Sequence, residues 1–266
     1  MKGPSTLKQA EDNWHTEMGA AFPGERVVLR EKDLFTELND LNWFKYLMFG
    51  VTGRLLPDKH IELIQAIWSL TISYPDPRIW NNRVAALAGT ANATGILGVS
   101  SAIAVSEANT YGNQVGLQAS EFIRRATRAE NSGDSLAGII TNQLKLKRVV
   151  PGYGRPIVQH DERIQPLLKK ATALKLSDGT HLKTARNIEK FLIQKKYRVR
   201  MNSAALTAAL LADLGLSLDE HYYCSVLAFS AGIIPCHIDS VNKKEGSFFP
   251  LSCQRLNYTG QGKRSW

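Results

Sequence analysis

The chain has 266 residues, of which 44% are hydrophobic and 21% are charged, and its formal net charge is +9. This composition is typical of a globular protein with one large domain or two modest ones, and the length is ample for a buried core. The positive charge suits a phosphate-bearing partner. However, there is no long run of Lys and Arg and no basic strand rich in aromatic residues, so we do not expect nucleic acid as a partner.

The cysteines and the N-terminus bear on the cellular compartment. Cys224, Cys236 and Cys253 form no CxxC pair and have no metal-type spacing to a histidine. Their odd number and apolar neighbours predict free thiols in a reducing compartment, and no metal site. The polar N-terminus has no hydrophobic signal segment, so we expect a cytoplasmic protein.

The first half of the chain shows helical patterns and few strand patterns. Residues 34–54 place apolar side chains at helix-like spacing and predict a helix that ends near Gly50. Residues 57–72 and 113–131 predict two more helices. The sequence YPDPRIWNN, residues 74–82, interrupts the chain with two prolines.

Residues 84–106 carry no charge and so imitate a membrane span. They are rich in Ala, Gly, Ser, Thr and Asn rather than in Leu or Phe. Because small side chains let helices approach closely, we interpret the segment as one central helix that is buried on all sides. We therefore expect no membrane association.

The second half is also helical. Helical patterns follow a glycine-rich loop in residues 162–176, 181–196 and 202–216. Ser217 and Glu220 then form a capping box, in which Ser217 caps the first-turn amides and Glu220 reaches back. Residues 221–241 predict one more apolar helix, with Pro235 as a candidate bend, and the tail is extended. The predicted fold class is all-α, with many packed helices.

The glycine-rich loop is followed by a short charged run. The loop RVVPGYG spans residues 148–154, and the run DER spans residues 161–163. Gly152 and Gly154 permit backbone turns and close approaches that other residues resist. Such a loop is suited to wrap a ligand with its backbone.

These stretches resemble the citrate synthase and citryl-CoA lyase family, whose Pro-Gly loop precedes an Asp-Pro-Arg. Three further stretches occur in the family's order, namely NTYGNQ at 109–114, the helix MNSAALTAALLADLGL at 201–216 and FPLSCQRLNYTG at 249–260. The resemblance runs from about Ile61 to Gly260, and we assign it to the C-terminal two-thirds of the family. It implies a citrate-synthase-like all-α fold.

The resemblance breaks at the catalytic positions. The family uses a His in the first turn, a His in the loop and an Asp in the later helix, and these positions hold Tyr111, Arg155 and Ala204 here. Ala204 cannot accept a proton, and Arg155 stays protonated and so cannot cycle as an acid and a base. Tyr111 can still donate a hydrogen bond to an enolate or a carbonyl. Ordinary citrate synthesis is therefore not expected.

The cofactor part of the family's site is retained. In the family, the backbone of the Pro-Gly loop wraps the adenine end of coenzyme A, so the resemblance implies that CoA or an acyl-CoA binds here. The residues that it assigns to the cofactor are Lys147, Val149, Val150, Gly152, Tyr153 and Gly154. It assigns Arg163 and Arg255 to a substrate carboxylate.

Four side chains are candidates for an altered reaction, and each also has an ordinary structural interpretation. They are Asp76, Tyr111, Arg155 and His160. Arg155 is either an anion clamp or an arginine that fills a vacated pocket beside an acid. His160 is either a replacement base or an exposed loop histidine, and Tyr111 is either a hydrogen-bond donor or a packing residue.

Asp76 and Arg163 also leave two interpretations open. Asp76 is the best substitute carboxylate in the chain, or it is the N-cap of a helix that has Pro77 in its first position. Arg163 binds a substrate carboxylate, or it forms a salt bridge to Asp161.

Two classes of function follow. The first is an enzyme that binds an acyl-CoA or a related thioester and makes or breaks a C–C bond with a partner other than oxaloacetate. The second is an inactive relative that binds CoA or a metabolite, or that pairs with an active subunit. The resemblance also implies a homodimer. Its two domains would be a large one, residues 1–115 joined by 205–266, and a small one, residues 116–204, which carries the loop.

Overall fold

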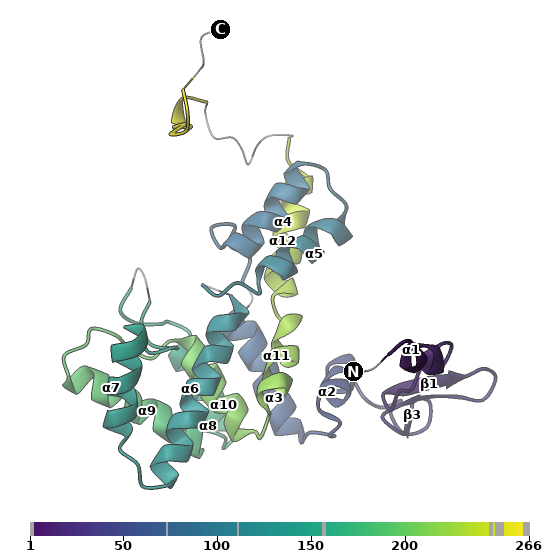
Figure 1. Ribbon diagram of the computed structural model, residues 1–266, viewed down its shortest axis with the longest axis horizontal. Helices are drawn as coiled ribbons and strands as arrows, with labels where there is room; N and C mark the ends of the chain where they lie inside the picture. Colours follow the sequence, from purple (N-terminus) through teal and green to yellow (C-terminus); the bar gives the residue numbers. More distant parts are fainter. Residues whose placement is uncertain are drawn as a thin grey trace. The chain divides into compact units, whose positions relative to one another are not determined.

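The computed structural model describes residues 3–72, 74–110, 112–155, 158–244, 247 and 253–262. The fold is all-α apart from three short strands among these residues (Figure 1), which confirms the predicted fold class. The chain divides into two compact units, Met1–Leu63 and Ile64–Trp266. The predicted division near residues 115 and 204 falls inside the second unit and stays a prediction.

The first unit combines short helices with a small antiparallel sheet, whose strand order is β1-β2-β3. Its elements are α1 Pro4–Ala10, β1 Gly19–Phe22, β2 Arg26–Leu29, β3 Lys32–Asp33 and α2 Trp43–Thr52, and α3 Asp58–Ile67 begins in it. No strand was predicted here from the sequence. The signal for the turn between β1 and β2 is a Pro-Gly pair that precedes two valines. In that turn Gly24 takes φ +80°, and the Glu25 amide donates to the Phe22 carbonyl.

The helix predicted over residues 34–54 is shorter than expected. It begins at Trp43, where the Asn42 side chain accepts a hydrogen bond from the Lys45 amide. It ends at Gly53, which adopts a left-handed conformation and closes the last turn. The residues before Asn42 form turns instead. Apolar spacing alone therefore misjudged the start of the helix, which is set by its capping residue, while the predicted end near Gly50 lies close to the observed one.

The second unit consists of helices. They are η1 Trp68–Ile72, α4 Trp80–Thr90, α5 Gly95–Val105, α6 Asn113–Asn131, α7 Leu136–Lys147, α8 Ile164–Ala173, α9 Thr180–Gln194, α10 Ser203–Asp213, α11 Leu218–Val226, α12 Ser230–Val241 and η2 Cys253–Arg255. The central helix is α10, because nine of its eleven residues are buried. It packs against α6 and α9. The four helices predicted between residues 113 and 216 are confirmed.

The single buried helix predicted over residues 84–106 is wrong. The segment forms α4 and α5, which are separated because Asn92 takes φ +55° and the Thr94 side chain caps α5. Nor is α5 buried on all sides, since Ile96 is 83% exposed and Leu97 is 61% exposed. The small residues do allow a close approach, but the neighbour is α12: a Cβ atom on Gly98 would lie 2.5 Å from the ring of His237.

The apolar segment predicted over residues 221–241 is also two helices. The capping box of Ser217 and Glu220 starts α11 as expected, and the chain breaks at residues 227–229 rather than at Pro235, which lies inside α12. By length and composition, Leu218–Val241 is the one candidate membrane span among the described residues. Buried core helices share these properties, so it carries little weight. Cys224 and Cys236 are buried and free, as predicted.

Candidate functional site

The loop after α7 is fixed to the N-terminus of α10 by hydrogen bonds. The Gly154 amide donates to the Arg200 carbonyl at 2.7 Å, and the Asn202 amide donates to the Gly152 carbonyl at 2.9 Å. The side chain of Asn202 donates to the Gly154 carbonyl and accepts from the Ala204 amide, which caps α10. A single asparagine therefore holds the loop and starts the helix.

Gly152 is required where the loop meets the helices. Its φ is +84°, and a Cβ atom there would lie 2.6 Å from Cβ of Ala205 on α10 and 3.0 Å from Cβ of Ala119 on α6. Any side chain would force the loop away from both helices. The second glycine, Gly154, also takes a positive φ of +95°.

The side chains predicted to contact a cofactor divide into two groups. Val150 and Tyr153 are buried, and the Tyr153 hydroxyl donates to the Ala185 carbonyl on α9 at 2.7 Å. Burial raises the pKa of the Tyr153 phenol well above its usual value. Lys147 and Val149 are exposed. The first pair anchors the loop, and the second pair is open to solvent.

The buried carboxylate of Asp161 lies at the N-terminus of α10. Its Oδ1 accepts from Nε of Arg163 at 2.7 Å, and its Oδ2 accepts from Nη2 of Arg163 at 2.7 Å and from the Ser203 amide at 2.8 Å. Burial raises the pKa of Asp161, but the bonds from Arg163 and Ser203 outweigh it and bring the pKa to about 2. Arg163 also donates to the Thr71 carbonyl. The charges of this pair are therefore satisfied internally.

Arg155 belongs to the same cluster. Its Nη1 forms an ion pair with Glu162 and lies 3.6 Å from Oδ1 of Asp161. Two acids thus face the guanidinium, whose side chain is mostly buried. An arginine in this position can hold an anion only in competition with Glu162.

Asp76 forms a separate turn. Its carboxylate accepts from the amide and the guanidinium of Arg78, at 2.9 Å and 2.7 Å. The next helix begins at Trp80 and has no side-chain cap, so the interpretation of Asp76 as its N-cap is wrong. Among the described residues, no hydrogen bond or ion pair joins Asp76 to Arg155 or Arg163.

Three predicted site residues contribute less to this geometry. Tyr111 lies outside the described residues. His160 is exposed on the loop just before Asp161, and Arg255 lies exposed in η2. The structure therefore brings together Arg155 and Arg163 around Asp161, which the sequence analysis considered only as a salt-bridge partner. Asn202 and Arg200 were not predicted. Their signals in the sequence are an asparagine directly before a helix and the basic run KKYRVR.

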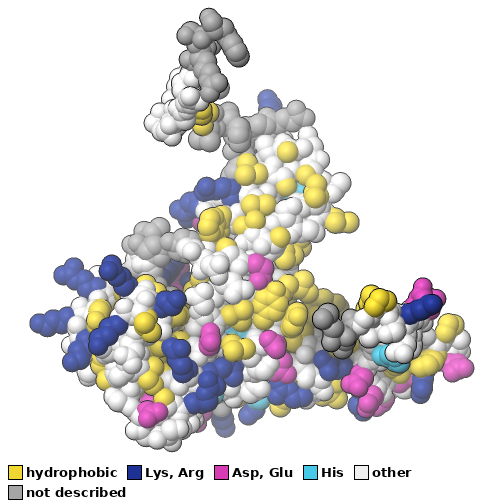
Figure 2. All heavy atoms as spheres, in the orientation of Figure 1, with side chains coloured by type: hydrophobic (Ala, Val, Ile, Leu, Met, Phe, Trp, Pro, Cys, Tyr) yellow, Lys and Arg dark blue, Asp and Glu magenta, His cyan; other side chains and the backbone are white. Residues whose placement is uncertain are grey.

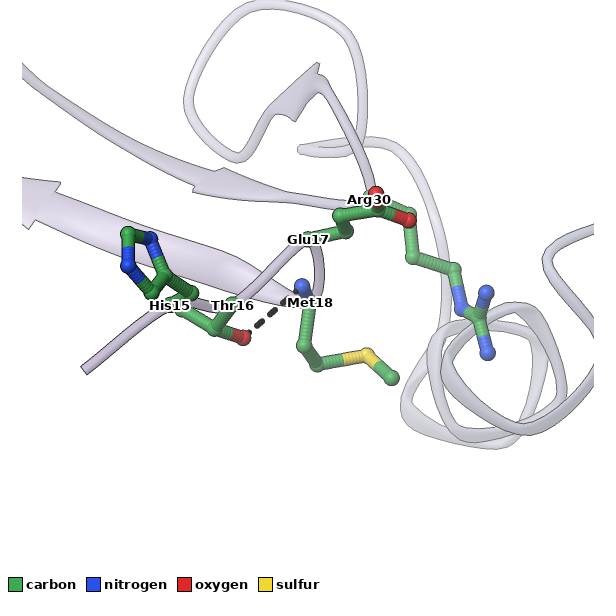
Figure 3. Close-up of a pocket in the computed structure, with 5 residues that line it drawn as sticks. All are labelled: His15, Thr16, Glu17, Met18 and Arg30. Atoms are coloured by element: carbon green, nitrogen blue, oxygen red, sulfur yellow. Dashed lines mark hydrogen bonds between the residues drawn. The ribbon is translucent and has the colours of Figure 1, made fainter. Parts of the chain in front are cut away.

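A hollow in the first unit involves none of the predicted residues. It is an open hollow of about 700 Å³, lined by His15, Thr16, Glu17, Met18 and Arg30 (Figure 3). The Arg30 guanidinium points away from His15 and donates to the Gly50 carbonyl at the end of α2. Among the described residues, no group of three or more His, Cys, Asp or Glu side chains is placed to hold a metal ion.

A glycine-rich loop is seated on the N-terminus of a central Ala/Leu helix within an all-α chain, as the resemblance to the citrate synthase family leads us to expect. Comparison with solved structures agrees. No family model matches the chain, and no curated protein sequence matches it significantly.

The fold is shared with three groups of enzymes of known structure. Citryl-CoA lyase from Hydrogenobacter thermophilus superposes with a TM-score of 0.82 and 19% identity, over 96% of this chain and 97% of that one. ATP citrate lyase from Methanothrix soehngenii, in complex with citrate and coenzyme A, gives a TM-score of 0.79 and 17% identity, over 99% of this chain and 45% of that one. Citrate synthase from Thermotoga maritima gives 0.63 and 14%, over 85% and 60%. The likeness thus extends beyond the range predicted from sequence.

Proposed function

We propose that the protein binds an acyl-CoA, or a related thioester, at the loop of residues 148–154. The observation that carries this proposal is the way the loop is built. Gly152 and Gly154 hold its backbone in positive-φ conformations, and Asn202 fixes it to α10, so the loop is preformed. Val149 and Lys147 stand exposed beside it, where an adenine and a phosphate would find an apolar contact and a cation.

The basic residues next to the loop support the same ligand. Arg148 ends α7 on one side, and Arg200 accepts a hydrogen bond from Gly154 on the other. Neither guanidinium is engaged in an ion pair among the described residues. Both are free to meet the phosphates of CoA. ATP citrate lyase, which shares this fold, has been solved with citrate and coenzyme A.

We further propose that the bound thioester takes part in making or breaking a C–C bond with a small carboxylate other than oxaloacetate. Arg155 would hold the carboxylate or the enolate oxygen once Glu162 releases it, and His160 would move the proton. Tyr111 would donate a hydrogen bond, Arg163 and Arg255 would bind the substrate carboxylate, and Asp76 would be the substitute carboxylate that accepts a proton. Asp161 is a poor base, because its pKa of about 2 leaves it almost no affinity for a proton at neutral pH.

One observation favours a second candidate, a CoA-binding protein without activity. Asp76, Asp161 and Glu162 are each paired with an arginine, so the described part of the site contains no unpaired carboxylate that could act as a base. A C–C bond reaction would then depend on His160. The two candidates share the thioester ligand and differ only in turnover.

Calorimetric titration of the purified protein with CoA and with acetyl-CoA tests the shared part. We expect dissociation constants in the micromolar range, that is, about −8 kcal/mol for 1 μM. Absence of binding by both ligands would overturn the proposal. Release of free CoA thiol from acetyl-CoA in the presence of a panel of keto acids then tests turnover. Release that His160→Ala abolishes supports the enzyme, and no release with any acid supports the inactive protein.

We also propose a homodimer. Helices α5 and α12 pack on each other and expose large apolar side chains, among them Ile96 and Leu97 on α5 and Ile238 on α12. Such a cluster on a folded chain is typical of an interface. Light scattering should give twice the chain mass for the native protein and the monomer mass for the double variant Ile96→Asp and Ile238→Asp. A native monomer would contradict the proposal.

A further inference from the structure

The net positive charge of the protein is concentrated in one part of the second unit. Residues 136–202 contain 15 Lys and Arg against 4 Asp and Glu, whereas the remaining residues contain 18 and 20. Figure 2 shows Lys and Arg side chains gathered over α7 and α9. The phosphates of one CoA engage only a few cations, so the loop ligand does not account for this concentration.

Most of the cations on this face that the structure describes are not engaged by acids of the same chain, although Lys195 lies over the ring of Phe191. Arg155 and Arg163 are paired internally. By contrast, the part of α9 and of the segment after it that the structure describes shows no ion pair for Lys183, Lys190 or Lys195. On α9, Lys183 and Lys190 are seven residues apart, which places them on one exposed face of the helix. A field of one sign over this face attracts a negatively charged partner.

Exposed apolar side chains lie among the cations. Leu146 is 80% exposed between Lys145 and Lys147, and Ile193 and Tyr197 are exposed at the end of α9. Apolar contacts inside a charged rim are the pattern of a protein interface. A groove for single-stranded nucleic acid would instead present several aromatic faces for stacking, and Tyr197 is the one exposed aromatic side chain among the described residues of this region.

The position of this face relates it to the loop. The segment after α9 leads directly into Met201, which pairs with Tyr153 of the loop, and α7 ends at Lys147 where the loop begins. A partner seated on α7 and α9 would therefore lie beside the thioester site. CoA and carrier proteins present the acyl group on the same phosphopantetheine arm, so a carrier protein seated here would bring the same thioester to the site, with protein contacts on α7 and α9 in place of the adenine contact.

We propose that this face docks a small acidic carrier protein, which delivers the acyl group on its phosphopantetheine arm to the loop. The docking surface is defined by Leu146, Lys183, Lys190, Ile193, Lys195 and Lys196. This inference rests on the proposed thioester function and specifies its substrate. Charge complementarity accelerates the encounter, and the exposed apolar side chains supply contact area.

The test compares acetyl-CoA with an acetylated acyl carrier protein from a bacterial type II fatty acid synthase, by calorimetry on the full chain. We expect the carrier protein to bind with a dissociation constant of about 10 μM or less at low salt, and to weaken at least tenfold when screening by salt is raised. The apo carrier protein, which lacks the arm, should retain the salt-dependent part of the binding free energy.

A charge-matched pair of variants separates the docking surface from general electrostatics. The triple variant Leu146→Asp, Lys190→Glu and Lys195→Glu should lower carrier-protein affinity more than tenfold and leave acetyl-CoA affinity within about twofold. The control Leu7→Asp, Lys8→Glu and Lys59→Glu changes the net charge equally at exposed positions of the first unit and should have little effect. Equal losses in both variants would overturn the inference.

The remaining outcomes are also decisive. If acetyl-CoA binds while the carrier protein does not, the docking inference fails and the proposed function stands. If a short oligo(U) RNA binds more tightly than the carrier protein and the triple variant abolishes that binding, the surface is a nucleic-acid site and the inference fails. If neither thioester binds, the proposed function itself fails.

Discussion

Two Asp-x-Arg sequences in this chain adopt the same local geometry in different surroundings. In Asp76–Arg78 and in Asp161–Arg163, the carboxylate accepts from the amide and from the guanidinium of the arginine two residues later. The exposed side-chain fraction is 88% for Arg78 and 21% for Arg163, and it is zero for Asp161. The local sequence therefore forms the motif, and tertiary contacts decide what the motif does.

The buried copy acquires contacts that the exposed copy lacks. Asp161 accepts the Ser203 amide at the start of α10, and Arg163 donates to the Thr71 carbonyl at the end of η1. These bonds join segments that are more than forty residues apart. The buried motif thus fastens the loop region to two helical segments, whereas the side-chain bonds of the exposed motif stay within its own turn.

The largest expected effect is the loss of the buried charge. Asp161→Asn leaves Arg163 without its carboxylate in a mostly buried position, and breaking such a pair costs about 3–5 kcal/mol. Asp76→Asn is the matched control, since it removes the same charge from the same motif at the surface, where ion pairs contribute less than about 1 kcal/mol. Urea unfolding at neutral pH measures both. Similar losses would mean that burial does not distinguish the two motifs.

A second test concerns the loop in front of the buried motif. Gly152→Ala combines a strained positive φ with a clash against Ala205 and Ala119, and we expect a loss of about 2–4 kcal/mol together with loss of CoA binding. Gly133→Ala is the control, because Gly133 has the same φ of +84° and nothing within 4 Å of the added Cβ atom. It should cost about 1 kcal/mol. If the two variants unfold alike, the loop does not rest on α10 as described.

The pH dependence of stability gives the third test. The pKa of Asp161 is about 2 in the folded chain and 3.8 when exposed, so the unfolded chain binds the proton first as the pH falls. Its contribution, about 2 kcal/mol, is complete above pH 4 and is lost between pH 4 and pH 2. Asp161→Asn should remove this part of the acid loss.

A buried histidine titrates in a neighbouring window and must be separated from Asp161. Burial and Arg124 lower the pKa of His221 to about 4, from 6.5 when exposed, so stability also falls between pH 6.5 and pH 4. The pH dependence that His221 contributes is the same in the native protein and in Asp161→Asn. It therefore cancels when the free energies of unfolding of the two proteins are subtracted. A difference that is constant from pH 5 to pH 2 would contradict the assignment to Asp161.

Sequence reasoning predicted the local parts of the site and missed the distant ones. The Pro-Gly loop was predictable because Gly152 and Gly154 announce positive φ values, and the capping box at Ser217 follows from a four-residue pattern. The bond from Ser203 to Asp161 was not, since the two lie 42 residues apart and no periodicity reports such a pair. The structure also favours the salt bridge between Arg163 and Asp161, which was one of the two interpretations that the sequence left open.

The same limit explains the errors in the fold. The helix predicted over residues 84–106 runs through Asn92 and Thr94. An asparagine that adopts a left-handed conformation and a threonine that caps a helix are both local signals for a break. The exposure of α5 is a different matter. Its residues are small and apolar, which suits a buried helix and an interface equally, and composition cannot distinguish the two.

The smallest expected effect separates the two roles of Arg155. Glu162→Gln removes an exposed partner, so the free energy of unfolding should change by less than about 0.5 kcal/mol. The freed guanidinium should bind a small dicarboxylate such as malonate about threefold more tightly, and Arg155→Gln in the same background should abolish the gain. Glu37→Gln, which removes the exposed ion pair with Lys32, is the control.

Calorimetric titration with malonate decides between an anion site and a structural arginine. A gain that depends on Arg155 means that Glu162 occupies the place of a substrate carboxylate, as an internal competitor that the ligand must displace. Asp161, whose Oδ1 lies 3.6 Å from Nη1 of Arg155, would then keep this contact and orient the guanidinium while the ligand is bound. No gain on removing Glu162 would leave Arg155 with a structural role, as the partner of Glu162 and Asp161.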